Sequence, residues 1–369
     1  MQMYIGIMSG TSLDGIDVAL CAFENDAYKD ACNILATHFM PYPTAIKLGL
    51  LALHEPSNNE LETAAMMANK LAIMYADSVN ALLISAKIKP SNIAAIGCHG
   101  QTIRHKPTFE NNIGYSLQIG NSALLAELTG IKVVSDFRSR DIAAGGQGAP
   151  LVPAFHQALF ASEHKNRAIV NIGGIANVTV LAKSGAVLGF DTGPGNMLID
   201  NWAKLRLGKD YDKDGEWAAT GIVLNTLLSN MLTEPYFALP PPKSTGRDLF
   251  NAHWLKQRLL YPHLRSQDVA RTLVALTAHT IYDAIALIDI DEVYLCGGGA
   301  HNVLLVQSLK QLFGAKLLTT TEALGVGVNW VEAAAFAWLA KQCCEHKPSN
   351  LPAVTGAEGL RVLGAIYPA

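Results

Sequence analysis

The sequence predicts an α/β protein built from two related halves, and three observations support this prediction. Strand-like and helix-like segments alternate along the whole chain, which is typical of sheets covered by helices. Four glycine-rich turns each follow an apolar strand-like segment. The hairpin pattern of residues 4–23 (YIGIMSGTSLDGIDVALCAF) has a weak echo in residues 168–182 (AIVNIGGIANVTVLA), which indicates an internal duplication into two lobes.

The first element is a hairpin around a polar turn. Residues 4–8 and 18–23 are short, apolar and partly β-branched, so each is expected to be a buried strand. Residues 9–17 (SGTSLDGID) contain glycines, hydroxyls and two aspartates, which is the composition of a turn. This segment is either an ordinary hairpin tip or a nest of amides and hydroxyls that holds a phosphate.

The later elements follow from periodicity. Apolar residues at helical spacing predict helices over residues 64–86, 124–128, 268–287, 302–313 and 330–341. Asp268 is a suitable N-cap, and Gly130 is a suitable helix end. Short apolar runs predict strands over residues 93–97, 131–134, 168–172, 176–181, 187–190, 292–296 and 316–318.

Composition favours a globular cytosolic protein. The 369 residues are enough for two domains, and 50% of them are hydrophobic while only 16% are charged. The net charge of −3 is dispersed, so we expect no binding to nucleic acid or to a membrane surface. We expect neither an export signal nor a membrane helix. The six cysteines form no CxxC pair, so they are expected to be reduced, mostly buried thiols.

The four glycine-rich turns cover residues 9–17, 173–174, 191–196 and 297–302, and together they favour a nucleotide-binding protein. A P-loop motif is absent, and no GxGxxG follows the first strand, which argues against a P-loop enzyme and a Rossmann site. The DTG motif at residues 191–193 is also found in aspartic proteases, but those enzymes need two such aspartates. Here the motif occurs once and is followed by Pro194, which argues against a protease.

A hairpin loop near the N-terminus, a second one midway and a late GGG motif resemble the actin/hexokinase/Hsp70 superfamily, whose ribonuclease H-like fold has two lobes and an interlobe cleft. More narrowly, long motifs are similar to those of the anhydro-N-acetylmuramic acid kinases over nearly the whole chain. These motifs are GIMSGTSLDGID, GCHGQTIRH, QIGNSALLAELTG, DFRSRDIAAGGQGAPLVPAFH, NIGGIANV, GFDTGPGN, KSTGRDLFN, CGGGAHN and VTGAEGLRVLGAIYPA.

The resemblance implies a reaction of peptidoglycan recycling. Such kinases convert ATP, water and 1,6-anhydro-N-acetylmuramic acid to ADP and N-acetylmuramic acid 6-phosphate, and they open the anhydro bridge as they phosphorylate O6. A carboxylate must take a proton from the attacking water, and the lobes must exclude bulk water. Asp191 directly follows the apolar strand of residues 187–190, and from this position alone two roles are equally supported: a base at a strand end, or a structural residue that caps a helix or binds a loop amide. The resemblance places the base at Asp191.

The resemblance also assigns the ATP contacts. It places the β- and γ-phosphates on the first turn and adenosine near the last one. The expected ATP-binding residues are Gly10, Thr11, Ser12, Leu13, Asp14, Gly15, Ile16, Asp17, Gly173, Gly174, Gly193, Gly195, Gly297, Gly298 and Gly299. Mg²⁺ is expected as a cofactor at Asp14 or Asp17, directly or through water, because a carboxylate beside phosphate needs a cation; alternatively, either aspartate only binds turn amides.

For the sugar, we expect contacts from His99, Gln101, Asp136, Arg138 and Glu332. Arg138 suits the lactyl carboxylate of a muramic acid, because a guanidinium pairs with a carboxylate in a bidentate manner. His99 is equally explained as a core histidine and Glu332 as a solvated helix residue. Residues 243–247 (KSTGR) either line the cleft or lie on the surface.

Two other functions remain open at this point, a kinase for an ordinary amino sugar and a non-kinase ATPase of the superfamily. A chaperone-like or filament-forming ATPase would carry an added domain or assembly surfaces. We expect no such domain after the late GGG motif, and this expectation favours a small-molecule enzyme. The superfamily pattern predicts an N-terminal lobe over residues 1–128 and a second lobe over residues 129–342, with residues from about 343 to 369 returning to the first. The apolar surplus is consistent with a homodimer.

Overall fold

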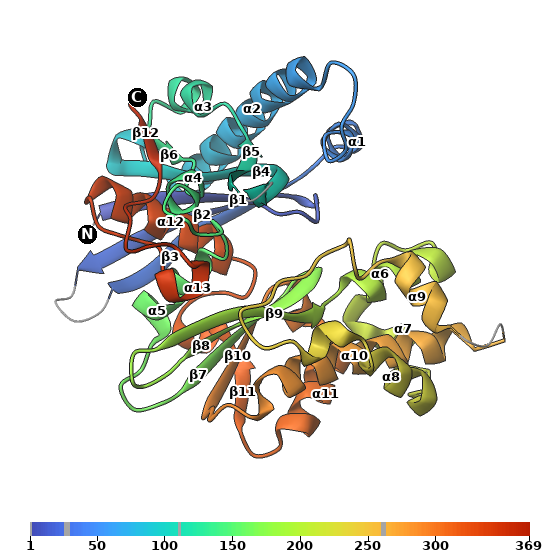
Figure 1. Ribbon diagram of the computed structural model, residues 1–369. Coiled ribbons are helices and arrows are strands. Elements are labelled where there is room, and N and C mark those ends of the chain that lie inside the picture. Colours follow the sequence, from blue (N-terminus) through green and yellow to red (C-terminus); the bar gives the residue numbers. More distant parts are fainter. Residues whose placement is uncertain (1, 26–29, 110–111, 260–262) are drawn as a thin grey trace. The chain divides into compact units, whose positions relative to one another are not determined.

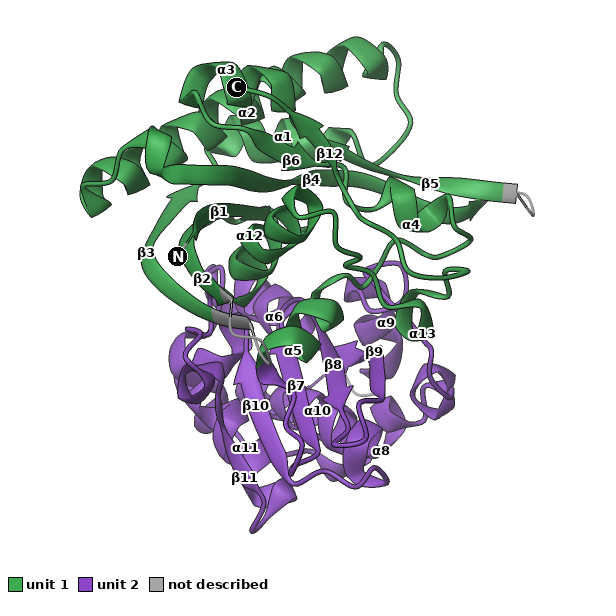
Figure 2. Ribbon diagram, turned by 90° about the vertical axis from the view of Figure 1, so that its left-hand side faces the viewer, with its two compact units in different colours: residues 1–159, 330–369 green, residues 160–329 purple. Residues whose placement is uncertain are grey.

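The computed structural model describes residues 2–25, 30–109, 112–259 and 263–369. The chain divides into two compact units, residues 1–159 with 330–369 (unit 1) and residues 160–329 (unit 2), which Figures 1 and 2 show. Each unit has its own sheet and its own hydrophobic core. No helix among these residues is both long and apolar enough to cross a membrane.

The sheet of unit 1 begins with an antiparallel meander, in which the first strand also pairs in parallel with β4. β4 pairs in parallel with β6 and antiparallel with β5, and β12 closes the edge beside β6. The order is β12-β6-β4-β1-β2-β3. The strands are β1 Gln2–Ser9, β2 Gly15–Asn25, β3 Asp30–Pro41, β4 Ile93–Phe109, β5 Asn112–Ile119, β6 Val133–Ser135 and β12 Ala365–Tyr367.

The sheet of unit 2 repeats this topology. An antiparallel meander is again followed by a strand parallel to its first member and by one further parallel strand, in the order β11-β10-β7-β8-β9. The strands are β7 Arg167–Ile172, β8 Ile175–Leu181, β9 Val187–Pro194, β10 Glu292–Cys296 and β11 Leu317–Thr320. The repeat confirms the predicted two-lobed α/β fold with a duplicated sheet core.

The helices cover these sheets. Unit 1 contains α1 Thr44–Ala52, α2 Glu60–Ala86, α3 Ser122–Thr129, α4 Ser139–Ile142, α12 Val331–Cys344 and α13 Pro352–Thr355, and α5 Val152–Phe160 reaches the boundary. Unit 2 contains α6 Met197–Leu207, α7 Glu216–Ala219, α8 Asn225–Leu232, α9 Ala252–Arg258, α10 Ser266–Ala286 and α11 Val303–Phe313. Short 3₁₀ turns lie at Pro90–Asn92, Lys213–Gly215, Pro235–Ala238, Gly298–His301 and Thr321–Leu324.

Helices α2 and α12 cover opposite faces of the unit 1 sheet (Figure 2). Ile5 and Ile7 of β1 pack in one cluster with Leu71 of α2, whereas Gly6 between them faces α12, because side chains alternate along a strand. The main chains touch there: a Cβ on Gly6 would lie 1.7 Å from the carbonyl oxygen of Ala333. The glycine thus allows the alanine-rich α12 to lie directly on the strand.

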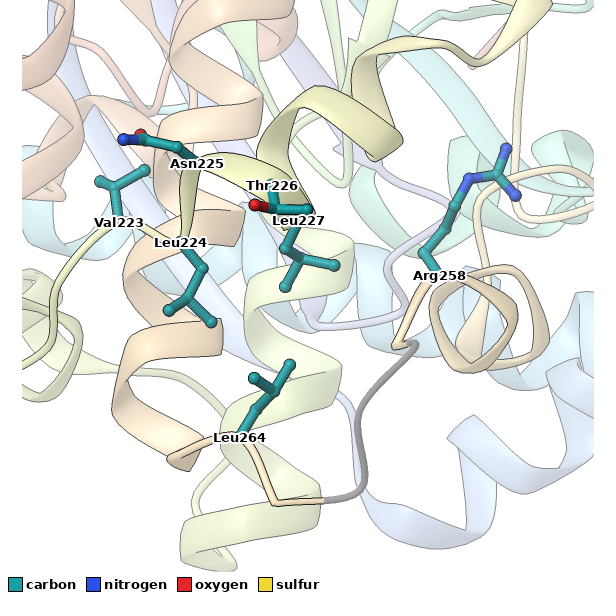
Figure 3. A pocket seen from close by; sticks show the side chains of 7 residues that line it. All are labelled: Val223, Leu224, Asn225, Thr226, Leu227, Arg258 and Leu264. Atoms are coloured by element: carbon teal, nitrogen blue, oxygen red, sulfur yellow. The ribbon is translucent and has the colours of Figure 1, made fainter.

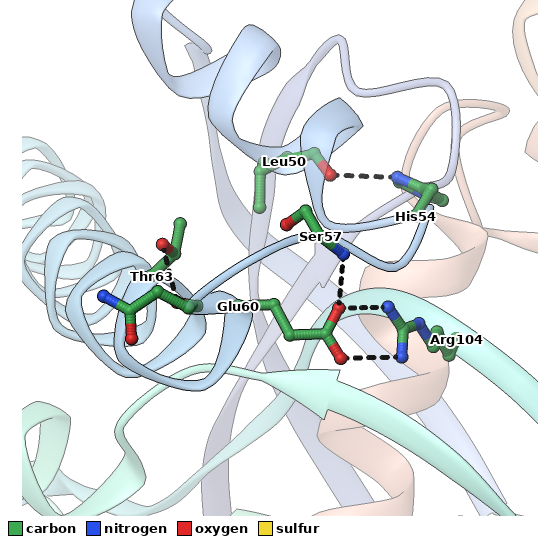
Figure 4. Close-up of polar contacts among 7 residues, drawn as sticks. Leu50, His54, Ser57, Glu60, Thr63 and Arg104 are labelled. Atoms are coloured by element: carbon green, nitrogen blue, oxygen red, sulfur yellow. Dashed lines mark hydrogen bonds and ion pairs between the residues drawn. The ribbon is translucent and has the colours of Figure 1, made fainter.

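An ion pair joins the start of α2 to β4 (Figure 4). Arg104 donates from Nη1 to Oε1 of Glu60 at 3.2 Å and from Nη2 to Oε2 at 2.6 Å. The main-chain N–H of Ser57 donates to Oε2 as well, at 3.3 Å. The hydrogen bonds from Arg104 hold the pKa of Glu60 below its ordinary value. This bidentate contact fixes the long β4 strand, which also carries His99 and Gln101.

The division into units differs from the boundaries that we expected at about residues 128 and 343. Unit 1 continues to Leu159, because β6 pairs with β4 and so extends the first sheet. It resumes at Trp330, because the whole of α12 packs on the first sheet. The apolar pattern also did not predict β3 or β5, whose residues alternate with polar ones. None of the six cysteines is in a disulfide, and five of them are buried.

Candidate active site

The first glycine-rich turn is a short loop with an exposed tip. It spans Gly10–Asp14, since β2 already begins at Gly15 and Asp17 pairs with Met8 of β1. Thr11, Ser12 and Asp14 are exposed. Leu13 adopts a left-handed φ of 60° and is buried, and Ile16 is buried as well, so neither side chain is available to a ligand.

A buried hydrogen-bond network supports this loop from below. Gln101 has no exposed surface, and its Nε2 donates to the carbonyl oxygen of Gly10 at 3.1 Å while its Oε1 accepts from the Tyr42 hydroxyl at 3.3 Å. Ser9 Oγ donates to the carbonyl oxygen of Gly100 at 3.0 Å and is 2.9 Å from the Tyr75 hydroxyl. Gln101 therefore holds the loop; its expected contact with a sugar stays a prediction.

Four ionisable side chains that are distant in sequence meet in unit 1. Asp17 lies near the start of β2, His99 is on β4, Arg138 precedes α4, and Glu332 is in the first turn of α12. Burial, Glu332 and then Asp14 raise the pKa of Asp17 to about 7. Burial also raises the pKa of Glu332, and the nearby Arg138 opposes this change. The cluster thus concentrates two carboxyl groups that resist ionisation beside a single guanidinium.

Arg138 and His99 form the other side of this cluster. Arg138 donates from Nη1 to the carbonyl oxygen of Gly148 at 2.8 Å, and its Nη2 lies 2.8 Å from Nε2 of His99. Burial and then the Arg138 charge lower the pKa of His99 to about 3, so the imidazole is neutral and its Nε2 accepts this bond. The Arg138 Nε is buried and has no partner. The guanidinium therefore keeps one buried N–H for an acceptor that the described residues do not supply.

Asp136, by contrast, is not brought into contact with these residues. It is exposed, has a left-handed φ of 55°, and accepts a hydrogen bond from Ser139 Oγ at 2.5 Å. These contacts are those of a turn residue before a short helix. Its expected role in sugar binding stays a prediction.

Asp191 of β9 is held in unit 2 by a single segment, residues 236–245. The Tyr236 hydroxyl donates to the Asp191 carbonyl oxygen at 2.8 Å, and the Asp191 N–H donates to the Lys243 carbonyl oxygen at 3.1 Å. The Thr245 N–H donates to the carboxylate Oδ2 at 3.0 Å. Burial raises the pKa of Asp191 to about 6, although the Thr245 hydrogen bond lowers it. A buried carboxylate of this kind is ionised at neutral pH and is a stronger base than an ordinary aspartate.

Glycine-rich turns of unit 2 pack against one another. The N–H of Gly195 donates to the carbonyl oxygen of Gly174 at 2.9 Å, and a Cβ on Gly195 would lie 2.3 Å from the Gly173 carbonyl oxygen. Gly193 adopts a φ of 151° and faces the ring of Phe237, so no other residue fits there without strain. The structure thereby joins the second and third turns at the start of α6.

The last glycine-rich turn lies beside them. Gly297 has a φ of 78°, and a Cβ there would lie 2.3 Å from Oδ1 of Asn171. A Cβ on Gly299 would lie 2.2 Å from the side chain of Ile172, the last residue of β7. Neighbouring strand ends thus place Gly173, Gly174, Gly195 and Gly297–Gly299 together, as their common position after strands predicts.

No group of three or more His, Cys, Asp or Glu residues suited to a metal occurs in the part of the chain that the structure describes. Asp14 is exposed and lies in the first turn, and Asp17 is half-buried and lies in β2, the strand that follows this turn. This donor set suits Mg²⁺, which is commonly held by one or two carboxylates together with substrate phosphates.

A separate apolar pocket lies in unit 2 (Figure 3). Its lining residues are Val223, Leu224, Asn225, Thr226, Leu227, Arg258 and Leu264. None of the predicted site residues contributes to this pocket, so it is not part of the candidate active site.

Tyr42 and Tyr236 are not among the residues predicted for the site, Asn196 was predicted only as the end of the third turn, and no individual residue of the KSTGR segment had a predicted role. Asn196 donates from Nδ2 to the Ile172 carbonyl oxygen at 3.1 Å and so ties the third turn to β7. Thr245 is far from Asp191 in sequence, and no regular spacing joins them. The only signal was the KSTGR motif itself.

Sequence comparison with known proteins identifies the family of this chain. The sequence profile of the anhydro-N-acetylmuramic acid kinases matches residues 2–369. The anhydro-N-acetylmuramic acid kinase of Nitrosomonas europaea is 54% identical over 368 residues, with 99% of both chains covered. That of Pseudomonas fluorescens is 49% identical over 371 residues, with 100% of both chains covered.

A solved structure, component A of the (R)-2-hydroxyglutaryl-CoA dehydratase of Acidaminococcus fermentans, aligns with a TM-score of 0.48 and 12% identity, covering 91% of this chain and 96% of that one. This likeness is too low to bear on function. The sequence relatives decide the assignment, because they are similar along their entire length. The chain belongs to the anhydro-N-acetylmuramic acid kinase family.

Proposed function

We propose that this protein phosphorylates 1,6-anhydro-N-acetylmuramic acid with ATP and water, giving N-acetylmuramic acid 6-phosphate and ADP in the recycling of peptidoglycan. The observation that carries the proposal is the sequence identity of 54% and 49%, over the full length, to two relatives named anhydro-N-acetylmuramic acid kinase. Six cysteines without a disulfide support a reducing compartment, and we place the reaction in the cytoplasm.

Asp191 is the proposed general base. It takes a proton from water as the water oxygen bonds to the anomeric carbon, and the bond from that carbon to O6 breaks. O6 bonds to the γ-phosphorus of ATP, and ADP leaves. The pKa of about 6 supports this role, because the carboxylate is ionised at neutral pH yet accepts a proton more readily than an exposed aspartate.

The glycine-rich turns are the proposed ATP site. The exposed Thr11 and Ser12 present hydroxyls and amides to the phosphates, and the turns around Gly174 and Gly297 allow close approach of the main chain. Asp14 or Asp17 would hold Mg²⁺, which neutralises charge on the transferring phosphoryl group. Burial raises the pKa of Asp17 most, and the nearby Glu332 and Asp14 raise it further; a bound cation would relieve this repulsion.

The cluster in unit 1 is the proposed muramic acid site. Arg138 is half-buried and has a buried Nε–H without a partner among the described residues, and a lactyl carboxylate would supply the missing acceptor. His99 holds the guanidinium in place as a neutral acceptor. Glu332 faces this charge and is suited to accept hydrogen bonds from sugar hydroxyls.

The test is to incubate the enzyme with ATP, Mg²⁺ and 1,6-anhydro-N-acetylmuramic acid in ¹⁸O-water and to analyse the quenched product by mass spectrometry. We expect a 6-phosphate with one ¹⁸O at the anomeric carbon. Phosphorylation of N-acetylmuramic acid or another open amino sugar, with no product from the anhydro sugar, would instead show an ordinary sugar kinase.

A further inference from the structure

The segment of residues 236–245 holds Asp191 in place, and it also carries polar groups that this supporting role does not explain. Residues 236–245 bond to the main-chain N–H, the carbonyl oxygen and the Oδ2 of Asp191. Oδ1 accepts no hydrogen bond from any described residue. The carboxylate is therefore held by one oxygen and keeps the other oxygen for a ligand.

Lys243 closes this segment on itself. Its Nζ donates to the carbonyl oxygens of Tyr236 at 3.3 Å and Phe237 at 3.0 Å, and it lies 4.9 Å from the centre of the Tyr236 ring. The two ends of the segment are thereby joined, and the amide of Thr245 stays aimed at Asp191. Lys243 thus acts on Asp191 only through the main chain.

Thr245 carries a second polar group at this position. Its Oγ1 is buried and has no hydrogen-bond partner among the residues that the structure describes, although the N–H of the same residue donates to the Asp191 carboxylate. Leaving a buried hydroxyl unpaired is costly, and in native proteins such groups commonly mark a missing water or ligand. A water between this hydroxyl and the free Asp191 oxygen would satisfy both.

We propose that Thr245 is a further catalytic residue, whose Oγ1 accepts a hydrogen bond from the attacking water while Asp191 accepts the other, and that Lys243 is a positioning residue for this pair. The inference rests on the proposed function. One water hydrogen passes to Asp191 as the oxygen bonds to the anomeric carbon; the hydrogen facing Thr245 stays on the product hydroxyl. Thr245 thus orients the lone pair of the nucleophile and neither gains nor loses a proton.

The test compares Thr245→Val, which removes the hydroxyl and keeps the shape and the main-chain N–H, with Thr245→Ser, which keeps the hydroxyl. With ATP, Mg²⁺ and 1,6-anhydro-N-acetylmuramic acid as probes, we expect Thr245→Val to lower kcat by about 10- to 100-fold with both KM values unchanged. Thr245→Ser should restore kcat to within about three-fold. Thr220→Val, at an exposed helix end, is the matched control.

The pH profile separates the hydroxyl from the main chain. Thr245→Val should leave the acid limb of kcat in place, because the N–H bond to Asp191 remains. Lys243→Met should move that limb to higher pH, because a loosened Thr245 amide no longer favours the ionised carboxylate. A Lys243→Met limb that does not move would overturn the positioning role.

A folded Thr245→Val enzyme with wild-type kcat, or an equal loss of kcat in Thr245→Ser, would overturn the catalytic role while the wild-type enzyme still forms the labelled product. A wild-type enzyme that forms no product overturns the proposed function and, with it, this inference. Thermal unfolding of each variant shows whether it is folded.

Discussion

Asp191→Asn should make the protein inactive and, at neutral pH, more stable. The substitution removes the charge of a buried carboxylate but leaves an oxygen that still accepts the hydrogen bond from the Thr245 N–H. Turnover is lost because an amide cannot take the proton of water. ATP binding should persist, because the glycine-rich turns are unchanged.

The size of the stability gain follows from the pKa of Asp191, which burial raises from 3.8 to about 6. At roughly 1.4 kcal/mol per pKa unit, the ionised carboxylate is about 3 kcal/mol less favourable in the folded chain than in the unfolded chain. The folded chain binds the proton more tightly, so its stability falls as the pH rises from about 4 to about 6. We expect Asp191→Asn to gain about 1–3 kcal/mol at pH 7.5 and to lose this advantage below pH 4.

Urea unfolding at pH 4, 5.5 and 7.5 measures this difference, followed by the fluorescence of the buried Trp202 and Trp254 of unit 2. Asp248→Asn, at an exposed aspartate, is the control and should leave the midpoint unchanged. In the wild-type enzyme, the acid limb of kcat/KM should lie near pH 6, because this ratio reports the ionisation of the free enzyme. A gain that does not depend on pH, or a variant less stable than wild type at pH 7.5, would refute the reasoning that the carboxylate is desolvated.

Two further substitutions test unit 1. Arg138→Ala should raise KM for the anhydro sugar by about 10- to 100-fold and leave KM for ATP unchanged, because it removes a charge-assisted pair with a carboxylate. Arg140→Ala, at an exposed arginine, is the control. A change confined to KM for ATP would assign Arg138 to the nucleotide site. Gly6→Ala should lower Tm strongly and weaken sugar binding, because its methyl group would overlap the Ala333 carbonyl and push α12 and Glu332 away. Gly49→Ala is the control, because its methyl group meets only the flexible end of Met67. An unchanged Tm for Gly6→Ala would contradict this packing.

Much of the fold could be predicted because its signals are local. Periodicity located α2, α10, α11 and α12, and the echo between residues 4–23 and 168–182 predicted the duplicated sheet. The polar alternation of β3 and β5 concealed them, because strands with one covered face resemble loops in an apolar count. The boundary near residue 128 failed to include β6, since pairing between β6 and β4 is not visible in either segment alone.

The candidate site divides in the same way. The glycine-rich turns could be predicted from the sequence, because turns after strands that require unusual φ angles favour glycine. Asp191 was predicted as the base from the family resemblance, and its role stays a prediction. The cluster of Asp17, Arg138 and Glu332 and the contact between Thr245 and Asp191 join residues from separate elements. Only the folded chain brings these residues together. The burial that results raises the pKa of Asp17 and Asp191, because desolvation depends on which groups surround a carboxyl in space, and this cannot be read from its neighbours in the sequence.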